Sequence, residues 1–183
     1  MTDDLTRLMT LALEQVPAGT DPEVVEAMAE AMRLFAAHET AFTTDPEFPL
    51  PAIFWLELPG GGAIPDPAGV SCILYERFPD LRIVAKDVVD TAEDSIEVST
   101  VFLHVNHGHV WVQRPMLYET MLFSTIHFEE QRGLLMGEPL RKTYDVQVRY
   151  ATREAAEEGH AKVREALLAG VSVEALYEME ILP

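Results

Sequence analysis

The sequence of 183 residues predicts an α+β protein. We expect an antiparallel sheet of about four or five strands, a C-terminal helix packed on one face of it, and an N-terminal pair of helices. Three observations predict this fold. Apolar residues recur at helical spacing over the first forty positions, alternate with polar residues from Leu81 on, and return to helical spacing after Thr152. The connections between the alternating segments are too short for parallel crossovers, so the sheet should be antiparallel.

The first forty residues are typical of two helices. From Leu5 to Val16 an apolar stripe recurs at helical spacing, and Pro17 interrupts it. The second helix is expected to begin with a capping box formed by Thr20 and Glu23, with a proline in its first turn. Because short helices are marginal in isolation, both stripes need a partner: each other, the sheet or a second subunit.

The segment that follows has the weakest pattern. Prolines and glycines punctuate residues 40–70, and residues 53–58 are the one short strand expected there. Residues 70–78 are apolar and remain ambiguous between helix and strand. The Gly60–Gly62 loop lacks the lysine or helix start that a phosphate-binding loop needs, so it predicts a turn and no cofactor.

The sheet is expected from residue 81 on. Residues 82–88, 97–105 and 116–123 are the first three predicted strands, and the alternation at residues 146–150 predicts a half-buried fourth. Residues 126–143, between the third and fourth predicted strands, are expected to form an exposed excursion.

A long helix is expected to close the chain. Thr152 caps it, residues 153–169 form it, and Gly170 ends it. Ser172 is expected to cap one or two further turns. Gly159 should let the helix backbone approach the sheet closely, at a cost of about 1 kcal/mol in helix propensity relative to alanine. The stripe expected to lie on the sheet consists of Ala156, His160, Val163 and Leu167.

Charge divides the chain into two parts. Residues 1–60 contain 11 acidic and 2 basic residues, which is half of the net charge of −18. We therefore predict that residues 1–80 form an acidic, helical and Pro/Gly-rich extension, and that residues 81–183 form the sheet with its helix. Whether the extension is a separate domain stays open.

Composition excludes several functional classes. A net charge of −18 without a basic patch argues against direct nucleic-acid binding. No apolar run is long enough for a membrane span, and the first residues lack the pattern of a secretory signal, so we expect a cytoplasmic protein. The single cysteine, Cys72, forms no internal disulfide.

Three sequence blocks occur in a recognisable order. They are Val98–Leu103 with Asn106-His107, Leu117–Phe123, and Arg149–Thr152 with Glu154-Ala155 and Gly159-His160. In these blocks the chain resembles a family of small uncharacterised proteins of tailed bacteriophages, prophages and high-GC bacteria, over residues of about 82–168. One departure is Asn106, where the family pattern has aspartate. The resemblance implies a phage-type context and no particular reaction.

Three histidines at the end of one predicted strand suggest a metal site. His104, His107 and His109 lie within six residues, and neutral imidazole suits zinc and other transition metals. The alternative, which we favour, is a polar strand end with exposed histidines. Only His107 falls on the family pattern.

A second group consists of Glu119, His160 and Arg149. Glu119 interrupts an apolar strand, and His160 lies on the apolar stripe of the last helix. If that helix packs over the Glu119 face, the two side chains are buried together. They would then form either a general acid/base pair or, as we favour, a buried hydrogen bond that fixes the helix to the sheet.

The leading functional hypothesis is a non-enzymatic interaction protein of phage type. It would bind a host or phage protein through an acidic surface, and inhibition of a host machine or defence system is one form of this. The first alternative is a small metal- or acid/base-dependent enzyme that uses His107, Glu119 and His160. The second is a virion or assembly accessory. An exposed sheet edge would favour a homodimer or a partner that adds a strand.

Overall fold

The computed structural model has the predicted α+β fold. A four-stranded antiparallel sheet has the strand order β3-β4-β5-β6, and a two-stranded sheet pairs β1 with β2. The N-terminal helical pair and the C-terminal helix are both present. The structure describes residues 2–39, 54–59, 61–92, 94–105, 115–124 and 143–178.

The chain forms two compact units. The N-terminal unit comprises residues 1–82 and 102–117, and the sheet unit comprises residues 83–101 and 118–183. The segment at 102–117, which links two strands of the sheet unit, therefore groups with the helices of the N-terminal unit. Each unit is described separately below.

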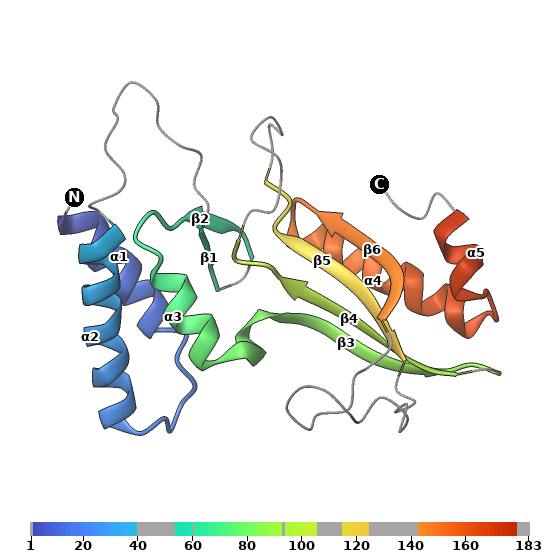
Figure 1. The fold of residues 1–183 in the computed structure, drawn as a ribbon, viewed down its shortest axis with the longest axis horizontal. Helices are drawn as coiled ribbons and strands as arrows, with labels where there is room; N and C mark the ends of the chain where they lie inside the picture. The colour runs from blue at the N-terminus through green and yellow to red at the C-terminus, as the bar shows by residue number, and fades with distance from the viewer. Residues whose placement is uncertain are drawn as a thin grey trace, which may run out of the picture. The chain divides into compact units, whose positions relative to one another are not determined.

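The N-terminal unit begins with helices α1 (Thr2–Leu13) and α2 (Pro22–Glu39), which contact each other (Figure 1). The cap of α2 differs from the predicted capping box. The Asp21 carboxylate accepts a hydrogen bond from the Glu23 N–H at 2.9 Å, while the Thr20 hydroxyl donates to the Pro17 carbonyl at 2.8 Å. Asp21 is one residue nearer the first turn, and this position satisfies an otherwise unpaired N–H group there.

The ambiguous segment at residues 70–78 is helical. It forms α3 (Val70–Arg77), which the 3-10 turn η1 (Pro79–Arg82) follows. The buried Asp66 carboxylate accepts a hydrogen bond from the Ser71 N–H at 2.6 Å, so it satisfies one N–H of the first turn of α3. This hydrogen bond favours the helical conformation, which the apolar pattern alone did not distinguish from a strand.

A small hairpin and aromatic packing complete this unit. Strands β1 (Trp55–Glu57) and β2 (Ala63–Pro65) pair in antiparallel register, and β1 coincides with the predicted short strand. The Tyr75 hydroxyl accepts a hydrogen bond from the Glu57 N–H at 3.1 Å. The Tyr75 ring packs edge-on against Phe102, with centroids 5.7 Å apart. Burial of this side chain raises the pKa of Tyr75 above its ordinary value.

The sheet unit is a meander of four strands that lie side by side in Figure 1. The strands are β3 (Ile83–Asp90), β4 (Ser95–Phe102), β5 (Tyr118–Ser124) and β6 (Thr143–Tyr150). Strand β4 ends at Phe102 and not at the predicted residue 105. Two residues later His104 has a φ of 46°, a left-handed conformation that is incompatible with an extended strand. The predicted excursion at 126–143 lies almost entirely outside the described residues.

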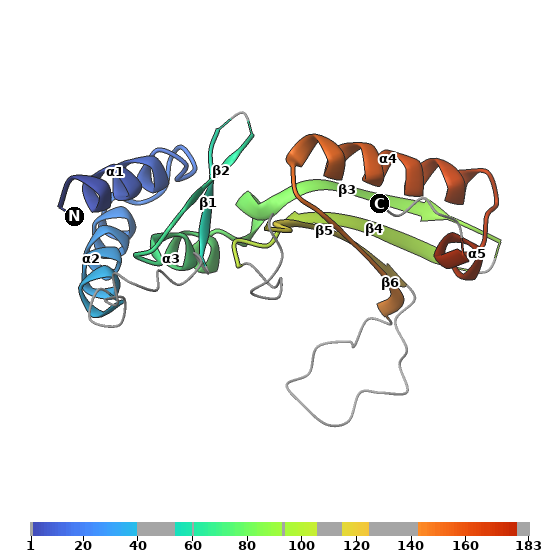
Figure 2. The ribbon, with the colours of Figure 1, turned by 90° about the horizontal axis from the view of Figure 1, so that it is seen from above.

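Helix α4 (Arg153–Leu168) covers one face of this sheet (Figure 2). The Thr152 hydroxyl accepts a hydrogen bond from the Ala155 N–H at 3.2 Å, as the sequence predicts. The chain leaves the helix at Gly170, whose φ of 82° suits glycine. The Ser172 hydroxyl then accepts a hydrogen bond from the Ala175 N–H at 3.2 Å, and α5 (Val173–Glu178) follows.

The predicted close approach at Gly159 is present. A Cβ atom at this position would lie 2.2 Å from the Tyr150 hydroxyl oxygen and 2.4 Å from the ring carbon that carries it. The predicted stripe of α4 is buried at Ala156, His160, Val163 and Leu167. Each buried valine or leucine contributes on the order of 2 kcal/mol by transfer from water. Apolar packing therefore holds α4 on the sheet, and Gly159 allows the helix backbone to approach the Tyr150 ring closely.

Candidate functional site

His160 is buried between α4 and the sheet, with 4% of its surface exposed. Both ring nitrogens have a partner: Nε2 lies 3.0 Å from Asp87 Oδ2 on β3, and Nδ1 lies 2.9 Å from Thr100 Oγ1 on β4. Asp87 also pairs with Arg164 of α4, whose Nε is 3.4 Å from Oδ2. One side chain of the helix is thus connected to two neighbouring strands.

The hydrogen bonds continue across the sheet. Thr100 Oγ1 lies 2.6 Å from Thr120 Oγ1 on β5, and both threonines are fully buried. Thr120 also has a hydrogen bond with Tyr150 on β6. When the imidazole hydrogen is on Nε2, this nitrogen donates to the Asp87 carboxylate and Nδ1 accepts from the Thr100 hydroxyl. We call these residues, Asp87, His160, Thr100, Thr120 and Tyr150, the His160 network.

The order of carboxylate, imidazole and hydroxyl in this network is that of a nucleophilic triad. A triad hydroxyl, however, must reach a substrate, and Thr100 is fully buried beneath α4. The arrangement instead satisfies polar groups that burial would otherwise leave unpaired. In this structure the His160 network therefore attaches α4 to the sheet.

Glu119 lies on the opposite face of the sheet, so the expected contact between Glu119 and His160 does not form. Successive strand residues point to opposite faces, and Thr120 of β5 is the residue that faces α4. Glu119 pairs instead with Arg149, its register neighbour on β6, at 2.9 Å from Nε to Oε1. Gln147 also donates to the same oxygen. The condition on which the prediction depended, that the helix covers the Glu119 face, is not met.

A second nearly buried carboxylate shares that opposite face and was missed from the sequence. Glu97 of β4 is three residues before Thr100, so strand alternation directs it away from α4. It pairs with Lys86 of β3 at 3.0 Å. The signal available in the sequence was its position in a predicted strand whose other residues, His104 excepted, are apolar or carry a hydroxyl group.

The predicted histidine cluster is described only in part. The His104 ring lies 5.5 Å from the Tyr75 ring, and its carbonyl accepts a hydrogen bond from the Trp55 N–H at 2.8 Å. His107 and His109 lie outside the described residues. Among the side chains that the structure describes, no three histidine, cysteine or acidic residues are placed to hold a metal ion.

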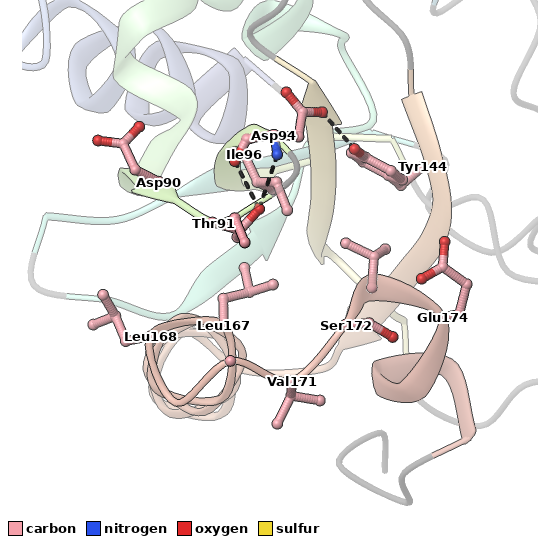
Figure 3. A pocket seen from close by; sticks show the side chains of 13 residues that line it. Asp90, Thr91, Asp94, Ile96, Tyr144, Leu167, Leu168, Val171, Ser172 and Glu174 are labelled. Atoms are coloured by element: carbon pink, nitrogen blue, oxygen red, sulfur yellow. Dashed lines mark hydrogen bonds between the residues drawn. The ribbon is translucent and has the colours of Figure 1, made fainter.

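A pocket of about 340 Å³ opens at one end of the sheet unit (Figure 3). Its walls come from the turn between β3 and β4, from Tyr144 on β6, and from the connection between α4 and α5. The sequence reasoning did not find it, because the three segments are far apart in the chain. The described lining residues are Asp90, Thr91, Ala92, Asp94, Ile96, Tyr144, Leu167, Leu168 and Gly170 to Glu174.

Comparisons with known proteins assign no role to the candidate residues. No protein-family model matches the chain, and no curated protein or solved structure is significantly similar to it. Across the described part of the chain, no helix combines the length and apolar character that membrane crossing requires.

Proposed function

We propose that this chain is a non-enzymatic interaction protein of phage type, which binds a host or phage protein through an acidic surface. The observation that carries the proposal is the pocket at the end of the sheet unit, which combines three carboxylates with an apolar lining. The net charge of −18 supports it, because an acidic surface accelerates association with a basic partner and suppresses other encounters.

The surroundings of the predicted catalytic residues favour binding over catalysis. His160 already bonds Asp87 and Thr100 beneath a helix, and Glu119 already bonds Arg149. A general acid or base must instead reach a proton of the substrate. Stabilisation of the fold accounts for both groups without a substrate.

Affinity capture followed by reconstitution tests this proposal. The untagged chain is immobilised and exposed to a lysate of a high-GC bacterium, and each retained protein is then purified and titrated against the free chain. We expect one protein to form a stoichiometric complex at about 50 mM salt, and its dissociation constant to rise at least tenfold at about 500 mM salt.

Three results contradict the proposal. The first is a complex whose affinity does not depend on salt, because an acidic surface would then not carry it. The second is about one zinc or iron per purified chain that is lost in H104A/H107A, which would favour the enzyme alternative. The third is recovery of the chain as a component of purified phage particles, which would favour the accessory alternative.

A further inference from the structure

The pocket at the end of the sheet unit has an apolar floor. Ile96, Leu167 and Val173 contribute to it and are themselves buried. Leu168 also lines the pocket, with 59% of its surface exposed. An incoming alkyl or aromatic group would cover this leucine and remove further apolar surface from water.

The rim of the same pocket is acidic. Asp90 is the last residue of β3, Asp94 lies in the turn that follows it, and Glu174 comes from the first turn of α5 (Figure 3). None of the described residues that line the pocket is a lysine, an arginine or a histidine. A pocket with carboxylates of one sign above low-dielectric walls concentrates the field and attracts a cation.

The acidic turn is held in place by its own hydrogen bonds. The Thr91 N–H and hydroxyl both donate to the Asp94 carbonyl, at 2.8 and 2.7 Å. The Asp94 carboxylate accepts from the Ser95 N–H at 2.7 Å and from the Tyr144 hydroxyl on β6. Because these bonds tie the turn to Ser95 and to Tyr144 of β6, the Asp94 carboxylate is positioned before a ligand arrives, which reduces the entropic cost of binding.

We propose that this pocket takes a basic side chain with an aliphatic stem, an arginine or lysine next to an apolar residue, presented by a segment of a partner protein. The inference rests on the proposed function and names the chemistry of its partner. The stem covers Leu168 and the apolar floor, and the cationic group is attracted by the carboxylates that line the pocket. The volume of about 340 Å³ is at the lower end of ligand pockets and fits one or two side chains.

Short peptides test the pocket directly on the full chain. The probe is the capped tetrapeptide acetyl-Leu-Arg-Leu-Gly-amide, and the matched control replaces arginine with citrulline, which keeps the shape and removes the charge. Binding is followed through the amide NMR signals of the chain. We expect a dissociation constant on the order of 1 mM for the arginine peptide, at least about fivefold weaker binding of the citrulline peptide, and shifts at Ala92, Gly170 and Val171.

Variants locate the site and separate it from general charge effects. D90N/E174Q removes two rim charges and keeps the side-chain shapes, and L168N removes the exposed apolar group. Each variant is expected to raise the dissociation constant of the arginine peptide about threefold to fivefold. E26Q/E76Q removes two exposed charges from helices of the N-terminal unit and should leave the dissociation constant unchanged.

Several outcomes would overturn the inference. These are equal affinity for the arginine and citrulline peptides, equal weakening by E26Q/E76Q, or binding of n-butylguanidinium as tight as that of the peptide, which would indicate a free small ligand. If the peptide fails while the captured partner binds wild type and D90N/E174Q equally, the pocket is excluded as the contact surface, and the proposed function then rests on the net charge of −18 and the salt-dependent complex alone. If the peptide fails and no captured protein forms a complex, both the inference about the pocket and the proposed function are contradicted.

Discussion

The polar residues on the two faces of the sheet differ in their access to water. Beneath α4, His160 and its threonines are shielded from water, and each polar atom depends on a partner within the network. On the opposite face, Glu119 is nearly buried, but its partner Arg149 keeps 36% of its side chain exposed. Water can therefore compensate for a lost contact at Arg149, whereas beneath α4 it reaches Asp87 and not His160 or the threonines. The same mutation should cost more beneath α4, and the following predictions test this difference.

The largest effect is expected from H160A. The substitution leaves Thr100 without its imidazole partner, leaves Asp87 with Arg164 alone and creates a cavity beneath α4. We expect the free energy of unfolding to fall by about 2–4 kcal/mol, measured by urea denaturation of the full chain. The exposed E158A on the same helix serves as control and should change it by less than about 0.5 kcal/mol. A loss below about 1 kcal/mol for H160A would show that the network does not hold the helix.

G159A tests whether packing against Tyr150 or helix propensity dominates. Propensity alone favours alanine by about 1 kcal/mol, whereas the added Cβ would lie 2.2 Å from the Tyr150 hydroxyl. We expect a net destabilisation of about 1–2 kcal/mol, because the buried ring must move. A161G, at an exposed position of the same helix, reports propensity by itself and should cost about 1 kcal/mol. A more stable G159A would refute the close-packing interpretation.

The ion pair on the open face should contribute less. In a double-mutant cycle with E119Q and R149Q, we expect a coupling energy below about 1 kcal/mol that decreases as salt is added. The equivalent cycle with H160A and T100V should give a larger coupling that salt does not change. Equal couplings with equal salt dependence would remove the distinction between the two faces.

The smallest effect is an alkaline loss of stability through Tyr150. Burial raises the pKa of this tyrosine above 10.0, and its hydrogen bond with Thr120 offsets part of that shift. As the pH rises, Tyr150 therefore ionises in the unfolded chain before it ionises in the folded one. The contribution of neutral Tyr150 to the free energy of unfolding is fully present below about pH 10, and it decreases as the pH rises through the pKa of Tyr150 in the folded chain. Unfolding measured between about pH 9 and 11 should show a shallower decrease in Y150F than in wild type. Parallel curves would contradict it.

Local signals in the sequence predicted the last helix well. Thr152 caps α4, Gly170 follows its end, and Ser172 caps α5, all as expected. These signals are reliable because a cap involves neighbouring residues and does not depend on distant contacts. The cap of α2 was displaced by one residue, since both Thr20 and Asp21 are good capping residues and the sequence does not rank them.

The candidate site could be predicted only in part. His160 was correctly placed on the buried stripe of α4, but its partners Asp87 and Thr100 were not identified. They lie 73 and 60 residues away in the chain, and sequence spacing carries no information on such contacts. The pocket was missed for the same reason.

The sequence by itself determined which residues share a face of each strand and which form the stripe of α4, because side-chain periodicity is a local property of the backbone. Only the tertiary structure decided which face of the sheet the helix covers. Both faces of β5 carry large apolar residues, so their hydrophobicity does not distinguish them. The position of α4 on the Thr120 face separates His160 from Glu119 and, through the turn at Gly170, brings α5 beside the β3–β4 turn to form the pocket.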